Sequence, residues 1–348
     1  MTTSSVAYGK SGTAAPISPT MPLARQVSLV AAAVGALLVV MAVIAVARWI
    51  PTAHQITAYR DHNDISWYAA RVYEIGGVAM SIWVIFYLVK QWHEKRRLTV
   101  DMLICIGGAV AYIFDLNNNF LQPNWLYSSQ WININTVTAH EPGWLNPVTD
   151  IPSPAVMILL YTFGLLAFSM IINQLMRLAQ RRFPAISNVG LIAVAFASAV
   201  VIDLALEIPM FALGLWSQGA APDWMRFGTN SAHVVVLAEV VLAAVMFAAY
   251  ASLRYFKNDQ GYSVVERSGY TGFKGTAVKM LCAITFVVGF ELFGNFGQAL
   301  TGLYSSPFPP NIPAHQLNGQ CGKGTAYGVC PGDPTYKMPI GHMGTPGT

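Results

Sequence analysis

The chain has 348 residues, of which 54% are hydrophobic and only 10% are charged. An ordinary soluble domain carries about 25% charged residues, so this composition excludes a typical soluble enzyme and indicates a polytopic membrane protein. The formal net charge of +4 is explained by the basic loops described below, and no nucleic-acid partner is needed to account for it.

Seven windows are apolar and long enough to cross a bilayer as helices. In chain order they cover residues 27–47, 72–92, 101–121, 154–176, 188–215, 232–253 and 277–303. We therefore expect an all-α fold, a bundle of seven transmembrane helices over residues 27–303. A disordered N-terminus over residues 1–26 would precede it, and a Gly/Pro-rich external tail over residues 304–348 would follow. No internal repeat is visible, and an odd number of helices disfavours an inverted-repeat transporter.

Basic residues gather in three short loops, at residues 90–97, 177–182 and 253–275. The loop at residues 122–153, by contrast, contains no Lys or Arg. The positive-inside rule then places the basic loops and the N-terminus in the cytoplasm, and the C-terminal tail outside the plasma membrane. The first loop fits this pattern poorly, because it is flanked by Arg48 and Arg71 and contains Arg60.

Two external segments are too long to be simple connections. The loop at residues 122–154 carries Trp125, Trp131 and Trp144. These tryptophans are expected either to pack over the bundle or to form an aromatic belt at the membrane interface. In the tail, Cys321 and Cys330 are expected to form a disulfide, since this side is oxidising. Free thiols are the alternative, and a metal site is disfavoured because the cysteines lack close ligand spacing.

The segment "VVIDLALEIPMF" at residues 200–211 places Asp203 and Glu207 four residues apart inside an apolar window. In a helix, this spacing puts both carboxyls on one face, one turn apart. Pro209 follows directly, and its missing N–H leaves the carbonyl of Ala205 without its helical partner. We expect a kink there, with a free backbone oxygen beside the two acids.

The other ionisable residues inside the windows are Glu74, Asp115, His233, Glu239 and Glu291. All of them, like Asp203 and Glu207, fall in the half expected to be external, and none falls in the cytoplasmic half. A charged side chain at the bilayer centre costs roughly 2.5–3.5 kcal/mol. This one-sided distribution therefore predicts a single polar pocket, open to the outside, to which five helices contribute.

Carboxylates crowded in a low dielectric cannot all ionise, so some are expected to hold protons and to act as general acids. We expect Asp203 and Glu207 to be the central acid–base pair. The assisting catalytic residues are predicted to be Asp115, Glu239 and Glu291. The predicted substrate-binding residues are Asn118, Asn119, Asn295, His233, Trp125 and Trp144.

Structural roles compete with this interpretation at several positions. Glu74 lies close enough to the end of its window to reach the interface. Asp115 is placed to end its helix, and Glu291 with Asn295 is placed to join neighbouring helices by hydrogen bonds. His233 is placed to be an ordinary interfacial histidine.

Motifs and residue types exclude several chemistries. The chain contains no Walker loop, no G-x-S-x-G and no H-E-x-x-H, and it lacks a lysine midway along the last window for retinal. Two functions other than acid–base catalysis remain: a proton-coupled transporter or lipid-binding membrane protein, and a metal-dependent membrane oxidoreductase. For the last, His233 with Asp203, Glu207 and Glu239 would supply hard, oxygen-rich ligands.

Several short motifs resemble one family. They are "FDLNNNF" followed by "PNW", then "HEPGW", "EIPMF" and "CPGDPTYKMP". Together they resemble the AveC-type (AveC-like) spirocyclase family of actinobacterial membrane proteins, over about residues 25–340. The resemblance implies an enzyme of secondary metabolism, a cyclase or dehydratase that needs no cofactor and acts on a lipophilic polyketide-like substrate. Members of this family that belong to polyketide pathways close a dihydroxyketone into a spiroketal, and some also dehydrate the product. The family supplies no settled catalytic residues to transfer.

Overall fold

The computed structural model describes residues 22–56, 62–146, 148–228, 234–309, 312–322, 325 and 328–337. The prediction of a disordered N-terminus concerns residues that lie mostly outside this description. At its boundary the first helix begins at Pro22, five residues before the expected start at residue 27. Polar Arg25 and Gln26 form part of this helix, although they were excluded from the apolar window.

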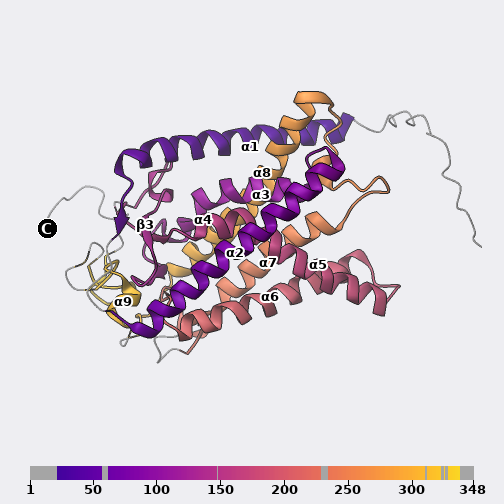
Figure 1. Ribbon diagram of the computed structural model, residues 1–348. Helices are drawn as coiled ribbons and strands as arrows, with labels where there is room; N and C mark the ends of the chain where they lie inside the picture. Colours follow the sequence, from indigo (N-terminus) through magenta and orange to yellow (C-terminus); the bar gives the residue numbers. More distant parts are fainter. Residues whose placement is uncertain are drawn as a thin grey trace, which may run out of the picture.

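The described chain is mostly helical, as predicted, and seven of its helices are long and apolar enough to cross a membrane. Figure 1 shows these long helices bundled together, with the short strands gathered at one end. The α-helices are α1 (Pro22–Trp49), α2 (Asp64–Lys95), α3 (Val100–Ala111), α4 (Met157–Leu159), α5 (Leu165–Arg182), α6 (Asn188–Ala212), α7 (Leu237–Tyr255), α8 (Gly272–Gly302) and α9 (Ala314–Leu317).

Two of the seven spans change helix type along their length. The span that begins with α3 continues as a 3₁₀ helix, η2 (Tyr112–Asn119). The span that begins with α4 passes through a π-helical turn, η4 (Leu160–Gly164), before α5. Such irregular turns inside helices occur often at functional sites. Both segments turn out to carry residues of the cavity described below.

Helix ends follow local polar signals that hydropathy does not detect. The helix α2 begins eight residues before its apolar window, because the Asn63 side chain caps it by accepting the Ser66 N–H at 2.9 Å. It ends at Lys95, and the next residue, Arg96, adopts a left-handed conformation with φ of 51°. The helix α6 starts in the same way, with the Ser187 hydroxyl accepting the Gly190 N–H at 3.1 Å. It continues past Pro209 to Ala212.

The helix α3 lies at the centre of the bundle, where it packs against α8 and against η4. Close approach depends on two adjacent glycines. A Cβ on Gly107 would lie 2.7 Å from the Val287 side chain, and one on Gly108 would lie 2.1 Å from the carbonyl oxygen of Tyr161. Small residues of this kind let helix backbones approach closely. They also fix where Tyr161 sits relative to α3.

The end of the bundle that carries the strands is closed by a region that we call the cap, formed by the described parts of residues 122–154, 213–228 and 305–337. Its strands, together with β1 and β7 from the adjoining segments, form three small antiparallel sheets. One sheet orders β1 (Gln55–Ile56), β3 (Asn133–Asn135) and β4 (Pro152–Pro154); the other two pair β2 (Trp125–Tyr127) with β5 (Trp216–Gln218) and β6 (Arg226–Phe227) with β7 (Val235–Val236).

Tryptophans and a disulfide hold the cap together. Trp125 and Trp131 are buried, so the packing alternative holds for them, and the Trp131 ring N–H donates to the Leu215 carbonyl at 2.7 Å. Cys321 and Cys330 form a disulfide, which confirms that prediction. The disulfide packs beside Leu126 of β2, so the C-terminal tail is joined to the first long loop.

At the opposite end of the bundle, one expectation is wrong. Asp101, at the start of α3, is a buried acid in the half where no ionisable group was expected. Its carboxyl accepts hydrogen bonds from Tyr87 at 2.5 Å and Gln91 at 3.0 Å, and it pairs with Arg254 at 2.9 Å. Hydropathy placed both Asp101 and Arg254 at window edges, where charges are ordinary. The fold instead buries them together.

Candidate functional site

A cavity of about 500 Å³ lies inside the bundle, below the cap. Most of its lining is apolar, with a small number of carboxyl, amide and hydroxyl groups, which is the usual make-up of a small-molecule site. Its walls come from α2, η2, the span of residues 157–182, α6, α7 and α8, and its roof from β2 and β5. All five predicted catalytic acids line this one cavity: Asp115, Asp203, Glu207, Glu239 and Glu291.

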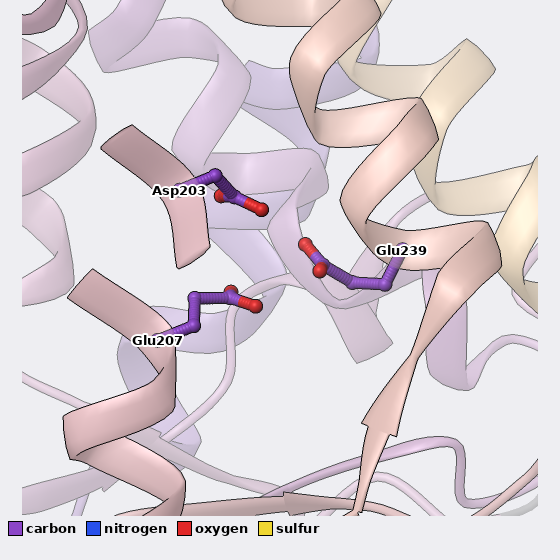
Figure 2. A group of neighbouring side chains, drawn as sticks. All are labelled: Asp203, Glu207 and Glu239. Atoms are coloured by element: carbon purple, nitrogen blue, oxygen red, sulfur yellow. The ribbon is translucent and has the colours of Figure 1, made fainter. Parts of the chain in front are cut away.

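Three of these acids form one cluster, which we call the carboxyl triad. Asp203 and Glu207 lie one turn apart on the inward face of α6, and Glu239 lies in the first turn of α7, which packs against α6. Figure 2 shows the three side chains pointing toward one another across the two helices. One carboxyl oxygen from each lies within 4.8 Å of the others. Each of the three residues is at most 7% exposed.

The remaining two acids meet at a tyrosine. The Tyr161 hydroxyl, on η4, lies 2.6 Å from a carboxyl oxygen of Asp115 and 3.0 Å from one of Glu291. A hydroxyl carries a single proton, so it donates to only one of these carboxyls. The second contact is a hydrogen bond only when the other carboxyl is protonated and donates to the tyrosine oxygen. We call these three residues the tyrosine bridge.

Polar neighbours support the tyrosine bridge from two sides. The Asn295 amide, one turn along α8, donates to Glu291 at 2.9 Å. The Tyr127 hydroxyl in the cap lies 3.4 Å from Asp115. Burial, followed by the nearby Asp115 carboxyl, raises the pKa of Tyr127 well above its ordinary value, so this hydroxyl remains a proton donor.

The cavity brings carboxyls together without neutralising them by protein cations. Among the described residues, no Lys, Arg or His lines it. Four carboxyl oxygens are buried with no hydrogen-bond partner in this part of the chain, one each on Asp203, Glu207, Glu239 and Glu291. Buried polar atoms without partners are unfavourable by about 1–3 kcal/mol each, and native proteins contain few of them. Protons, a bound cation or the polar groups of a ligand would satisfy these oxygens.

The predicted substrate-binding residues fall into three groups. Asn118, Asn295 and Trp125 line the cavity, and the Asn118 amide donates to Gln298 at 3.3 Å. His233 lies outside the described residues. Asn119 and Trp144 do not line the cavity, so the structure does not support a direct substrate contact for either.

Asn119 and Trp144 have structural contacts instead. The Asn119 side chain accepts the backbone N–H groups of Asn124 at 2.6 Å and Trp125 at 2.8 Å, and it donates to the Trp125 carbonyl. It therefore fixes the start of β2 relative to η2. Trp144 packs edge-on against Phe120, with ring centres 5.5 Å apart. Glu74 also has a structural role, because it pairs with Arg71 and binds the cap by accepting the Ile132 N–H at 2.9 Å.

Several lining residues were missed from the sequence. Tyr161, Tyr127, Trp216 and Gln298 all contribute to the cavity. The prediction of the pocket rested on acids, histidines and asparagines within the apolar windows, and it did not include tyrosines or glutamines. The signal available for Tyr161 was a hydroxyl inside an apolar window, which hydropathy counts as ordinary.

The expected direction of the opening is wrong. We predicted a pocket open to the external loops, but the buried aromatic side chains of Trp125, Tyr127 and Trp216 cover that end. Their rings pack edge-on, with centres 5.0 Å apart for Trp125 and Trp216. Elsewhere in the cap, buried Glu141 accepts the Asn117 amide at 3.3 Å. Burial raises the pKa of Glu141 to about 7.

The carboxyl triad also has the geometry to bind a hard metal ion. Three carboxylates offer oxygen ligands, which suit ions such as Mg²⁺, Mn²⁺ or non-haem iron. The carboxyl groups of Glu207 and Glu239 approach closely enough for a side-chain hydrogen bond, which requires a proton on one of them. The same three side chains can therefore hold either a shared proton or a cation.

One comparison with known proteins identifies a family. The model of the family described as "Spirocyclase AveC-like" matches residues 95–305, which is more than half of the chain. The match contains α3 to α8 and so includes all five acids of the cavity. No curated protein and no solved structure matches the chain. The chain belongs to the AveC-like spirocyclase family.

Proposed function

We propose that this protein is a membrane-embedded acid–base enzyme that cyclises or dehydrates a lipophilic, polyketide-like substrate. The observation that carries this proposal is the convergence of five acids on one mostly apolar cavity of about 500 Å³. The apolar lining suits a hydrocarbon skeleton, and the unpartnered carboxyl oxygens suit its hydroxyl and carbonyl groups. Family membership supports a cyclase or dehydratase role.

The chemistry needs one acid and one base. In spiroketal formation, a protonated carboxyl donates its proton to the ketone oxygen while a substrate hydroxyl attacks the carbonyl carbon. A neighbouring carboxylate accepts the proton that this hydroxyl releases. The hemiketal then loses its protonated hydroxyl as water, the second substrate hydroxyl attacks the same carbon, and its proton returns to the protein. The net change is the loss of one water, and no oxidant or reductant is consumed.

The carboxyl triad fits these two roles best. Its three carboxyls are too close for all of them to carry charge in a low dielectric, so protonated and ionised groups coexist within reach of one substrate. Asp203 and Glu207 would serve as the central pair, with Glu239 accepting a hydrogen bond from protonated Glu207 between turnovers. The tyrosine bridge would supply a second acid group, with Asp115 and Glu291 assisting at the other wall of the cavity.

We further propose that the cap faces the outside of the plasma membrane and the N-terminus faces the cytoplasm. The loop of residues 122–153, most of which lies in the cap, has no Lys or Arg, whereas the opposite loops are basic. The Cys321–Cys330 disulfide in the cap supports the same orientation, because disulfides persist in oxidising compartments. A thiol-reactive probe that cannot cross membranes, applied to intact cells with single exposed cysteines in each loop, would test this orientation.

The catalytic proposal is tested with purified protein in lipid nanodiscs and a panel of hydrophobic dihydroxyketones. Asp203→Asn and Glu207→Gln keep the shape of each side chain but remove its acid–base function. We expect turnover to fall by about 10²- to 10⁴-fold, the usual contribution of a positioned acid or base. Glu94→Gln, at an exposed acid on α2 far from the cavity, is the matched control. Full activity in both cavity variants would show that the assignment is wrong.

The geometry of the carboxyl triad supports one further candidate, a metal-dependent membrane enzyme. Three carboxyl oxygens within 4.8 Å of one another can coordinate one ion. Elemental analysis of the purified protein, with Glu239→Gln as comparison, decides between the two candidates. A stoichiometric metal lost in this variant would favour metal-dependent chemistry, whereas turnover in a metal-free preparation would favour acid–base catalysis.

Transport is less well supported. Among the described residues, the buried pair of Asp101 and Arg254 at the basic end does not line the cavity, and hydrogen bonds hold both side chains. Proton flux into vesicles that is lost in Glu207→Gln would favour a proton-coupled transporter over catalysis.

A further inference from the structure

The cavity has a wall that is exposed on the side of the bundle. Val72 and Gly76 of α2 both line the cavity, yet Val72 is 68% exposed and Gly76 is also exposed. The roof residues Trp125, Tyr127 and Trp216 are at most 7% exposed. The cavity is therefore closed at the cap and thinly walled at the side.

Two adjacent glycines show where α2 is packed and where it is not. A Cβ on Gly77 would lie 2.8 Å from the Val156 side chain and 3.5 Å from that of Leu160, so this face of α2 is closed against the start of the span of residues 157–182. A Cβ on Gly76 would meet no atom within 4 Å. The closely packed face of α2 at Gly77 is thus adjacent to an unpacked face at Gly76.

The other side of the opening is formed by α6. Leu206, half-buried, lies between Asp203 and Glu207 in the sequence and lines the same cavity. Packing joins α2 to the span of residues 157–182 and joins α6 to α5 and α7, whereas no packing of comparable extent joins α2 to α6 among the described residues. Figure 1 shows α2 and α6 diverging from the cap end. We call this loosely packed space between α2 and α6 the gap. Asp203 and Glu207 line the same cavity as the exposed wall of α2.

The described residues that we assign to the rim of this gap are uncharged. Its half-buried members are Met80, Phe168 and Leu206, and exposed Ile75 and Val78 continue the apolar surface along α2. Gly76 lies twelve residues into the 32-residue α2, near its middle. A rim at this depth in a membrane-spanning bundle faces hydrocarbon rather than water.

We infer that the gap between α2 and α6 is a lateral entrance through which an uncharged, lipophilic substrate enters the cavity directly from the bilayer. The inference rests on the proposed function for the class of molecule, and on the cavity geometry alone for the route. An apolar rim admits a hydrocarbon skeleton with hydroxyl and ketone groups. It excludes molecules that carry a permanent charge, because desolvating the charge is too costly.

The entrance is tested by photolabelling in phosphatidylcholine vesicles. The probe is 3-trifluoromethyl-3-phenyldiazirine, a small uncharged molecule that partitions into hydrocarbon. Light expels N₂ from it, and the resulting carbene inserts into a C–H or O–H bond of the nearest side chain. Mass spectrometry then compares inward-facing Asp203 and Glu207 with Val201 and Ile208, which are exposed on the same helix.

We expect labelling at all four positions in the native protein. Gly76→Trp fills the open space, so labelling of Asp203 and Glu207 should be lost while labelling of Val201 and Ile208 is retained. Val72→Trp, at the second exposed wall residue, should act in the same way. Gly289→Trp is the matched control, because Gly289 lies on α8, has open space around it and does not line the cavity. It should leave labelling unchanged at all four positions.

The labelling results test the lateral entrance independently of the catalytic proposal. Labelling of Asp203 and Glu207 at the native level in both tryptophan variants, with the lipid-facing references unchanged, would overturn the lateral entrance. An unlabelled interior in the native protein would do the same. Because the readout does not require turnover, loss of interior labelling in Gly76→Trp supports the entrance even if Asp203→Asn and Glu207→Gln retain full activity.

Discussion

The Tyr161 hydroxyl lies 2.6 Å from Asp115, a contact that joins a π-helical turn to a 3₁₀ helix across the bundle. The same hydroxyl reaches Glu291 on α8 at 3.0 Å. A proton can therefore pass between the two carboxyls through this hydroxyl. Tyr161 itself has the geometry of a positioning and relay group.

Tyr161→Phe removes this relay and keeps the aromatic ring. We expect turnover to fall by at least about 10-fold, since relayed proton transfer would no longer connect Asp115 with Glu291. The dependence of kcat on pH should also shift, which a purely structural role would not produce. Tyr255→Phe is the control, because its hydroxyl contacts exposed Gln180 far from the cavity. An unchanged pH profile in Tyr161→Phe would contradict the relay.

Glu141 makes the stability of the cap depend on pH. Burial raises its pKa from its ordinary value of 4.5 to about 7. Between these values the folded protein holds a proton that the unfolded chain has released, so stability should fall as the pH rises from about 4.5 to 7. Glu141→Gln should remove this slope and should stabilise the protein at pH 8 by up to about 3 kcal/mol.

Thermal unfolding in detergent between pH 4 and 8 measures this slope. The exposed-acid variant Glu94→Gln should keep the native slope. Identical slopes in Glu141→Gln and in the native protein would contradict the assignment.

The buried pair of Asp101 and Arg254 should contribute strongly to stability when only one partner is removed. Arg254→Met leaves a buried carboxylate without its counter-ion and should destabilise the protein by about 3–5 kcal/mol. Adding Asp101→Asn removes the unpaired charge and should restore part of that loss. Melting temperatures of the single and double variants test this coupling, with exposed Arg181→Met as the control. Strictly additive effects would show that the two side chains do not interact.

The Cys321–Cys330 disulfide closes a short loop that packs against β2. Replacing both cysteines by serine should destabilise the tail by about 2–3 kcal/mol, the loop-closure contribution for ten residues. Limited proteolysis of the tail should then be faster. A reductant should accelerate proteolysis of the native protein and have no effect on the double variant. Equal rates in all samples would show that the tail is held by other contacts.

Hydropathy was sufficient to predict the number of long helices and their approximate positions. Hydropathy did not predict the residues at which the helices begin and end, because these depend on single side chains. The helix α2 begins where Asn63 can cap it, and α7 begins only at Leu237, because Val235 and Val236 pair with β6 instead. Neither signal appears in an average over an apolar window.

The acids of the cavity were predictable because their cost in a membrane is large. Asp203 and Glu207 lie inside a window where charge is unfavourable, and the structure brings them to Glu239 as expected. Asn119 could not be assigned in the same way, since a buried asparagine binds backbone groups as readily as substrate. Its hydrogen bonds to the start of β2 depend on how residues 120–124 fold back, which no sequence pattern indicated.

The aromatic roof has a consequence for the equilibrium on the protein. Under the proposed lateral entrance, the chamber exchanges molecules with hydrocarbon rather than directly with the aqueous phase, so it holds a low concentration of water. Ring closure that expels one water is then favoured over re-addition, because the expelled molecule has few partners inside and dilutes into the surroundings. The seal made by Trp125 and Trp216 would thus favour condensation over hydrolysis, independently of any effect on the rate.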